Sequence, residues 1–169
     1  MKKYRIILIL LLVVIVTGCE QKKSKIDAPT FNTYASNLGI KVQDVTQYYG
    51  YADVAYQTNY NEFKVLFIDF KDSGVDSQGI FLDQVNNIYS SAGVSDSTNG
   101  NSPTTVITSV ATTKKYTKDT DNGDNWVYTK IVTEDKFYYA AKVDDTMLYI
   151  VSDLDHKDTV EQLISTMKY

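Results

Sequence analysis

The chain has 169 residues, a formal net charge of −4 and 43% hydrophobic residues, a composition typical of a globular protein. It contains one cysteine and one histidine, and no arginine after Arg5, which excludes a disulfide framework, a cysteine-based metal site and arginine clamps for phosphate groups. The acidic balance argues against nucleic-acid binding, which needs a basic face.

The N-terminus combines a basic start with a short apolar run. Lys2, Lys3 and Arg5 precede the aliphatic residues 6–16, and two small residues then stand in front of Cys19. This order is typical of a secretory signal peptide. The apolar run would form a helix of about 16 Å, too short for a hydrocarbon core of roughly 30 Å.

The last four residues of this segment, V-T-G-C (16–19), resemble the bacterial lipobox. In that family the cysteine sulfur receives a diacylglyceryl group and a peptidase cuts directly before the cysteine. The resemblance implies a lipoprotein signal peptide at 1–18, lipidation at Cys19, and a protein held on the extracellular side of the cell membrane. Two acyl chains hold a protein durably, whereas one does not. The alternative is an ordinary signal peptide with an accidental cysteine.

Residues 19–28 are predicted to be the lipidated cysteine and its tether. Removing 1–18 takes away three of the 17 basic residues and none of the 21 acidic ones, so the mature net charge is −7. As a flexible coil, residues 20–28 would reach about 30 Å when fully stretched. Lys22, Lys23 and Lys25 would either attract anionic lipid head groups or be solvated.

The remaining residues, 29–169, have the length of one domain. Apolar residues at helical spacing predict a first helix at 29–38. The stretch 40–46 is ambiguous. Residues 52–58 and 63–71 predict a pair of strands, and the second is apolar on both faces, which favours an interior position in the sheet.

A second helix is predicted at 75–91, where Phe81, Val85 and Ile88 belong to an apolar stripe. The turn-forming residues 92–103 predict a mobile loop. From Thr104 onward the hydrophobic period becomes two, and four strands follow, at 104–119, 125–133, 136–143 and 146–153. Residues 155–169 predict a closing helix.

The predicted element order is α-β-β-α-β-β-β-β-α. It describes one α+β domain with a single, mostly antiparallel sheet of about six strands and with helices packed on one face.

Tyrosines give the strongest indication of a binding surface. Adjacent strand residues face opposite sides, so Tyr138 and Tyr139 cannot both enter one core face. Some tyrosines should therefore line the open side of the sheet, where they offer contact area at low entropic cost. The alternative is that these tyrosines bind no ligand and occur there because tyrosine favours β-strands. The predicted ligand-binding residues are Tyr48, Tyr49, Tyr51, Tyr56, Tyr128, Tyr138 and Tyr139.

No metal, cofactor or catalytic residue is predicted. Residues 118–126 (KDTDNGDNW) resemble a calcium loop in composition, but counted from Asp119 the sixth and twelfth positions hold Asp124 and Lys130, where an EF-hand needs Gly and Glu. An acidic type I′ hairpin turn at Asn122 and Gly123 is expected instead. His156 stands among charged residues at the start of the last helix and is expected to be solvated.

Paired carboxylates are the one enzyme route that composition leaves open, because a glycosidase needs only two of them at a suitable spacing. The candidates are Glu62, Asp69, Asp72, Glu134, Asp135, Asp144, Asp145 and Asp153. The leading interpretation is a membrane-anchored extracytoplasmic binding module for an envelope protein or wall polymer. The alternative is a carboxylate-dependent hydrolase acting on cell-wall glycan.

The stretch K-V-D-D-T-M-L-Y (142–149), followed by a last helix ending in K-Y, resembles a group of uncharacterised lipoproteins from low-GC Gram-positive bacteria. Members of that group read closer to R-V-D-N-T-L-x-Y, with a helix ending in G-Y. Here Lys142 replaces Arg, Asp145 replaces Asn, and Lys168 precedes the last tyrosine. The resemblance implies an anchored single α+β domain and lends no activity.

Overall fold

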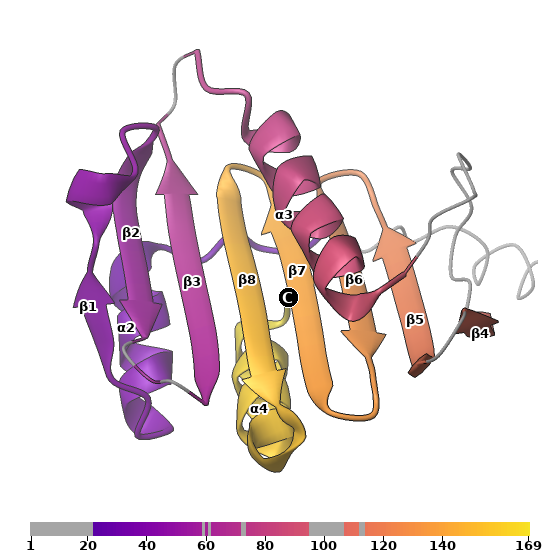
Figure 1. Cartoon of the computed structure of the whole chain (residues 1–169). Coiled ribbons are helices and arrows are strands. Elements are labelled where there is room, and N and C mark those ends of the chain that lie inside the picture. Colours follow the sequence, from indigo (N-terminus) through magenta and orange to yellow (C-terminus); the bar gives the residue numbers. More distant parts are fainter. Residues whose placement is uncertain (1–21, 59, 61, 72–73, 95–106, 112–113) are drawn as a thin grey trace, which may run out of the picture.

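The computed structural model describes residues 22–58, 60, 62–71, 74–94, 107–111 and 114–169. The predicted signal peptide, Cys19 and most of the predicted loop 92–103 lie outside the described residues. Helices and one open sheet form an α+β domain (Figure 1). None of the helices in the described part of the chain has the length and apolar character needed to cross a membrane.

The predicted elements are present, with two differences in the strands. The ambiguous stretch 40–46 contributes a short edge strand, and the run 104–119 divides into two strands. The helices are α2 (Ala28–Asn37), α3 (Ser77–Ala92) and α4 (Lys157–Met167), with 3-10 turns η1 (Thr46–Tyr48) and η2 (Leu154–His156). The strands are β1 (Val42–Asp44), β2 (Ala52–Thr58), β3 (Phe63–Phe70), β4 (Ile107–Ala111), β5 (Lys114–Asn122), β6 (Trp126–Val132), β7 (Lys136–Val143) and β8 (Thr146–Asp153).

The sheet has eight strands in the order β1-β2-β3-β8-β7-β6-β5-β4, and every neighbouring pair is antiparallel. After β3 the chain passes through α3 to the far edge and returns as a meander from β4 to β8 (Figure 1). The last strand, β8, thereby lies between β7 and β3. The predicted interior position of β3 is confirmed, because β3 pairs with both β2 and β8.

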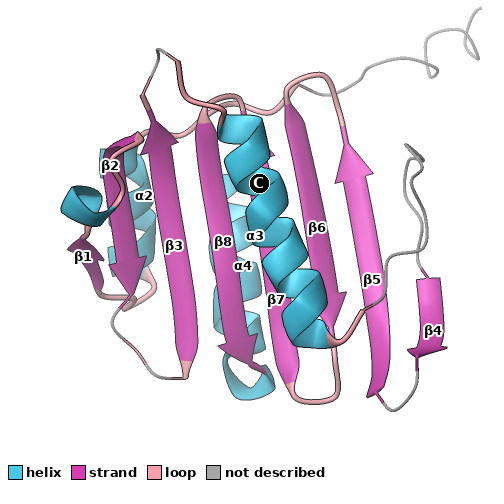
Figure 2. Ribbon diagram, turned by 45° about the horizontal axis from the view of Figure 1, so that its top comes forward, coloured by secondary structure: helices cyan, strands magenta, loops and turns pink. Residues whose placement is uncertain are grey.

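The prediction that the helices pack on one face is wrong. The helices α2 and α4 cover one face of the sheet, and α3 crosses the other (Figure 2). The central strands β3, β7 and β8 are apolar and mostly buried on both sides. A strand of this kind needs cover on both faces, since leaving one large apolar side chain exposed loses about 1.5–3 kcal/mol of stabilisation from burial.

Each face has its own core. On one side, the ring of Phe31 in α2 stacks on Phe67 of β3, with 4.5 Å between centroids and 10° between planes. On the other side, Phe81, Val85 and Ile88 of α3 join the buried side chains of the sheet, and the sequence predicted this stripe. The α2 helix is fixed at its start by Asp27, whose carboxylate accepts a hydrogen bond from the Thr30 N–H at 2.9 Å.

Lys168 ends α4 in the left-handed region, at φ 58° and ψ 29°, directly before the buried Tyr169. A side chain in this conformation costs roughly 1–2 kcal/mol relative to glycine, partly offset by the larger entropy that glycine loses on folding. We expect Lys168→Gly to raise the free energy of unfolding by about 0.5–1 kcal/mol in urea denaturation. Lys168→Ala keeps the Cβ and serves as the control, so an equal gain from alanine would contradict this explanation.

Candidate functional site

Residues 22–27, which we call the strap, cross one end of the sheet before α2 begins (Figure 2). The Lys23 N–H donates to Asn125 Oδ1 at 3.2 Å, and Asn125 Nδ2 donates to the Lys23 carbonyl at 2.9 Å. Farther along, Ile26 packs against the core beneath α2 and α4. Residues 23–27 are therefore part of the domain, and not the free coil expected from the sequence.

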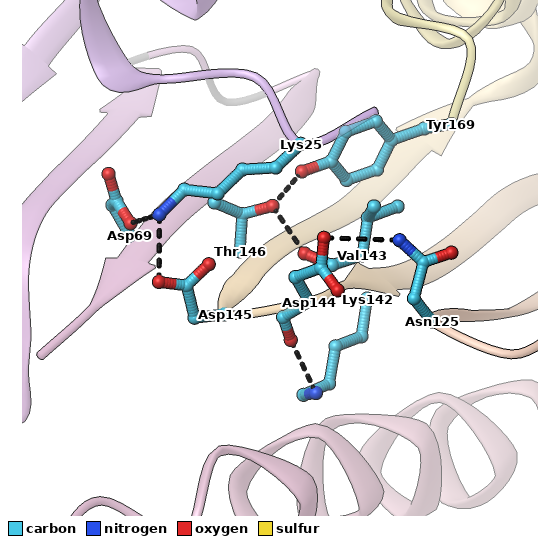
Figure 3. Close-up of polar contacts among 9 residues, drawn as sticks. All are labelled: Lys25, Asp69, Asn125, Lys142, Val143, Asp144, Asp145, Thr146 and Tyr169. Carbon is cyan, nitrogen blue, oxygen red and sulfur yellow. Dashed lines mark hydrogen bonds and ion pairs between the residues drawn. The ribbon is translucent and has the colours of Figure 1, made fainter. Parts of the chain in front are cut away.

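The Lys25 ammonium bridges two carboxylates from different strands (Figure 3). Its Nζ lies 3.0 Å from Asp69 Oδ1 in β3 and 2.7 Å from Asp145 Oδ2 in the β7–β8 turn. Burial disfavours the charged amine, but the hydrogen bonds and charges of the two carboxylates outweigh burial and raise the pKa of Lys25. Burial raises the pKa of Asp69, because it disfavours the charged carboxylate, and this effect outweighs the opposite effect of Lys25.

The C-terminal residue is tied to the same turn. The Tyr169 hydroxyl forms a hydrogen bond with Thr146 Oγ1, and Thr146 Oγ1 also donates to the Val143 carbonyl at 2.8 Å (Figure 3). Thr146 is fully buried and Tyr169 nearly so, and this burial raises the pKa of the Tyr169 phenol above its usual value. The stretch 142–149 and the C-terminal tyrosine thus contact each other.

A stacked aromatic row lies beside the strap on the α2/α4 face. The Trp126 and Tyr128 rings are 6.1 Å apart and nearly parallel, and Tyr128 stacks on Tyr139 at 5.8 Å. The Lys23 ammonium lies 4.3 Å from the Trp126 centroid, within the range of a cation–π contact. Burial lowers the pKa of Lys23, because it disfavours the charged amine. The strap therefore covers part of this aromatic surface.

The hairpin before Trp126 differs from the predicted type I′ turn. Its central residues are Asp124 and Asn125, neither of which has a positive φ, and Gly123 N donates to the Trp126 carbonyl at 2.8 Å. A Cβ on Gly123 would lie 2.3 Å from Trp126 Nε1. The glycine is thus required because the indole ring passes close to the backbone, and not because of its φ angle.

Asp119 belongs to the same region of the sheet. Its Oδ2 accepts a hydrogen bond from the Tyr128 hydroxyl at 3.1 Å, while its buried Oδ1 has no hydrogen-bond partner among the described residues. Burial, together with the nearby charge of Asp119, raises the pKa of Tyr128 to about 12. Asp119 belongs to the stretch 118–126, which resembles a calcium loop in composition alone, and no group of three potential metal-binding side chains is found within the described part of the chain.

The predicted ligand-binding tyrosines do not form one surface. Tyr138 and Tyr139 do face opposite sides, but both sides are covered, and the two rings are only 6% and 3% exposed. Tyr56 and Tyr128 lie against the α2/α4 core, whereas Tyr49 and Tyr51 lie against the α3 core. The premise of an open sheet face was wrong, so most of these rings contribute to packing.

One group of predicted tyrosines remains accessible, in residues 48–51, which we call the Tyr48–Tyr51 corner. Tyr48 in η1 is 75% exposed. Tyr49 and Tyr51 are half-buried, with their rings in an edge-on contact at 5.8 Å. In the described part of the chain, Tyr48 and Leu82 of α3 are the large hydrophobic side chains that stay exposed.

Among the carboxylates proposed for hydrolysis, Asp69 of β3 and Asp145 of the β7–β8 turn share one partner, Lys25. Lys25 occupies the position between these two, where a glycosidase needs space for its substrate. Asp153 pairs with Lys136, and Asp135 accepts a hydrogen bond from Thr133 at 2.7 Å. These acids therefore have structural partners, and Asp72 lies outside the described residues.

Two further features are distant from these groups. His156 is half-buried and its ring lies 5.2 Å from that of Phe63, so it is less solvated than expected. A shallow hollow lies between the end of α2 and β1, and its lining contains no acidic or aromatic side chain. The hollow therefore fits neither the predicted tyrosine-rich binding surface nor a catalytic pair of carboxylates.

No sequence pattern indicated the strap contacts, because Asp69 and Asn125 are far along the chain from the lysines that they contact. Comparison of the chain with protein-family models, curated proteins and solved structures finds no match. The arrangement must therefore be interpreted from its own chemistry. It joins the start of the domain and its last residue to one end of the sheet.

The Thr146–Tyr169 hydrogen bond should contribute measurably to stability because both groups are buried. We expect Thr146→Val and Tyr169→Phe each to lower the free energy of unfolding by about 1–3 kcal/mol. In urea denaturation, the double variant should lose less than the sum of the single losses, because both changes remove one shared bond. Thr166→Val, at an exposed threonine in α4, should stay within about 0.5 kcal/mol. Additive losses would contradict the coupling.

Proposed function

We propose that this chain is a membrane-anchored extracytoplasmic binding module, attached through a diacylglyceryl group on Cys19. The anchor is supported by the order of charge, apolar run, small residues and cysteine in 1–19. Further support comes from the resemblance at 142–149 and the C-terminus, whose Thr146 and Tyr169 are in contact. Lys168 adopts a left-handed conformation where the resembling group has glycine, as expected for a shared helix ending.

The observation that carries the binding role is the exposure of Tyr48. Because Tyr48 is 75% exposed, most of its aromatic ring is in water. Its neighbours Tyr49 and Tyr51 are half-buried and pack against each other. Tyrosine is enriched in binding surfaces because it offers a large, rigid contact area. The corner is also fixed in place, since Lys71 Nζ donates to the Gly50 carbonyl at 2.8 Å. The proposed partner is an envelope protein or a wall polymer.

The hydrolase alternative has weaker support. Asp69 and Asp145 lie close together and burial raises the pKa of Asp69, as a general acid requires. However, both carboxylates bind Lys25, and the one hollow described above lies at β1, away from them. The pair is better explained as the attachment point of the strap.

The anchor can be tested by metabolic labelling with a fatty-acid probe. The wild-type chain should incorporate the probe and sediment with membranes, because the thioether-linked diacylglyceryl group requires the Cys19 sulfur. Cys19→Ser should lose both properties while remaining folded. Equal labelling of the two chains would contradict lipidation at this residue.

The binding role can be tested by placing a photocrosslinking side chain at single positions in cells. A crosslinker in place of Tyr48 should give a discrete adduct, because the corner contacts the partner. The same crosslinker at Leu82, the other exposed large hydrophobic position, is the matched control and should give none.

An absence of adducts at Tyr48 would contradict this surface, and so would equal adduct formation at both positions. Mass spectrometry of the adduct distinguishes a protein partner from a wall polymer. Release of soluble fragments from wall glycan by the purified wild-type chain, and not by Asp69→Asn, would favour the hydrolase instead.

A further inference from the structure

We infer that the strap fixes the orientation of the domain on the membrane, so that the end of the sheet carrying the β5–β6 and β7–β8 turns faces the lipid head groups. This inference rests on the proposed lipid anchor at Cys19. It goes beyond the anchor, because a lipidated protein on a flexible tether has no preferred orientation. The interaction surface is this end of the sheet, and its partner is the lipid bilayer.

The contacts of the strap all lie at one end of the sheet. Lys23 is held by Asn125 in the β5–β6 turn. Lys25 is held by Asp145 in the β7–β8 turn and by Asp69 near the end of β3 (Figure 3). Asn125 Nδ2 also donates to Asp144 Oδ2 at 3.1 Å, which connects the two turns. The strap is thus bound at several points across the neighbouring strands β6, β7, β8 and β3.

The connection between Cys19 and the first hydrogen-bonded residue of the strap is very short. Three residues, Glu20, Gln21 and Lys22, separate Cys19 from Lys23, whose backbone is hydrogen-bonded. Four steps along an extended chain span at most about 14 Å. The strand β6, with seven residues, is about 24 Å long. The connection is therefore too short for the opposite end of the sheet, which carries the β6–β7 turn, to face the bilayer instead.

The orientation does not depend on attraction between lysines and anionic lipids. Lys23 contacts the Trp126 ring, and Lys25 contacts Asp69 and Asp145, so both amines are directed toward the domain. Lys22 and Lys25 are both exposed, but Lys25 is held by its two carboxylates, whereas Lys22 makes none of these contacts. The geometry of the tether therefore sets the orientation, and it should persist on bilayers without anionic lipid.

The Tyr48–Tyr51 corner lies at this same end. It directly precedes the first residue of β2, and the Lys71 N–H, just after β3, donates to the Tyr51 carbonyl at 3.2 Å. This orientation therefore brings the corner close to the bilayer. Of the two proposed kinds of partner, it favours a membrane-bound protein over a wall polymer.

The test uses the lipidated full chain on phosphatidylcholine vesicles that carry a quencher on the lipid head group. A fluorophore is attached to Asp124→Cys in one variant and to Glu134→Cys in another. These exposed positions lie in the turns at opposite ends of β6. The Cys19 sulfur is occupied by the lipid, so the introduced thiol is the one that reacts. We expect several-fold stronger quenching at position 124 than at position 134.

Releasing the strap should reduce this difference. Lys25→Ala combined with Asn125→Ala removes the hydrogen bonds and ion pairs that hold residues 23–25. The flexible connection between Cys19 and the domain can then lengthen to as many as eight residues, 20–27. Quenching at the two positions should become more nearly equal. Lys22→Ala, at an exposed position that makes none of these contacts, is the matched control and should keep the full difference.

The outcomes separate this inference from the anchor. Failure of the wild-type chain to bind vesicles contradicts the anchor, and the orientation with it. Equal quenching of vesicle-bound wild-type chain at both positions contradicts the orientation alone. A difference that appears only after phosphatidylglycerol is added would overturn the role of the strap and assign the orientation to charge.

Discussion

The pairing of β3 with β8 is the contact on which the rest of the molecule depends. Seven residue pairs, from Phe63–Ser152 to Asp69–Thr146, join a strand from the first half of the chain to the last strand. Without this ladder, the β4–β8 meander and the β1–β3 unit would be separate sheets. The register brings Asp69 beside the β7–β8 turn, so that Lys25 can contact both Asp69 and Asp145.

Burial on both faces follows from the same pairing. Because β8 is inserted between β3 and β7, the three strands occupy the middle of the sheet and have no edge to offer to solvent. Their apolar side chains then need cover from α2 and α4 on one side and from α3 on the other. This explains why tyrosines such as Tyr138 and Tyr139 are packing residues, and why Tyr48 is the exposed aromatic side chain among the described residues.

The strap and the C-terminal tyrosine use the same end of the sheet for different purposes. Tyr169 fixes the end of α4 to Thr146, whereas Lys23 and Lys25 fix the segment before α2 to Trp126, Asp69 and Asp145. In the proposed anchored protein, the strap would transmit the position of the anchor to the whole sheet. It would thereby relate the membrane to the proposed binding surface.

The sequence by itself determined the helices and nearly all the strands, because local periodicity depends on neighbouring residues. The proposal that Cys19 is an attachment point also rests on the sequence alone. The sequence also showed that residues 63–70 are apolar on both faces, although one-sided helix cover was expected. The tertiary structure alone decided which tyrosines stay exposed and that Lys25 meets Asp69 and Asp145. Such contacts join residues up to 120 positions apart, and their formation depends on strand order, which local patterns do not encode.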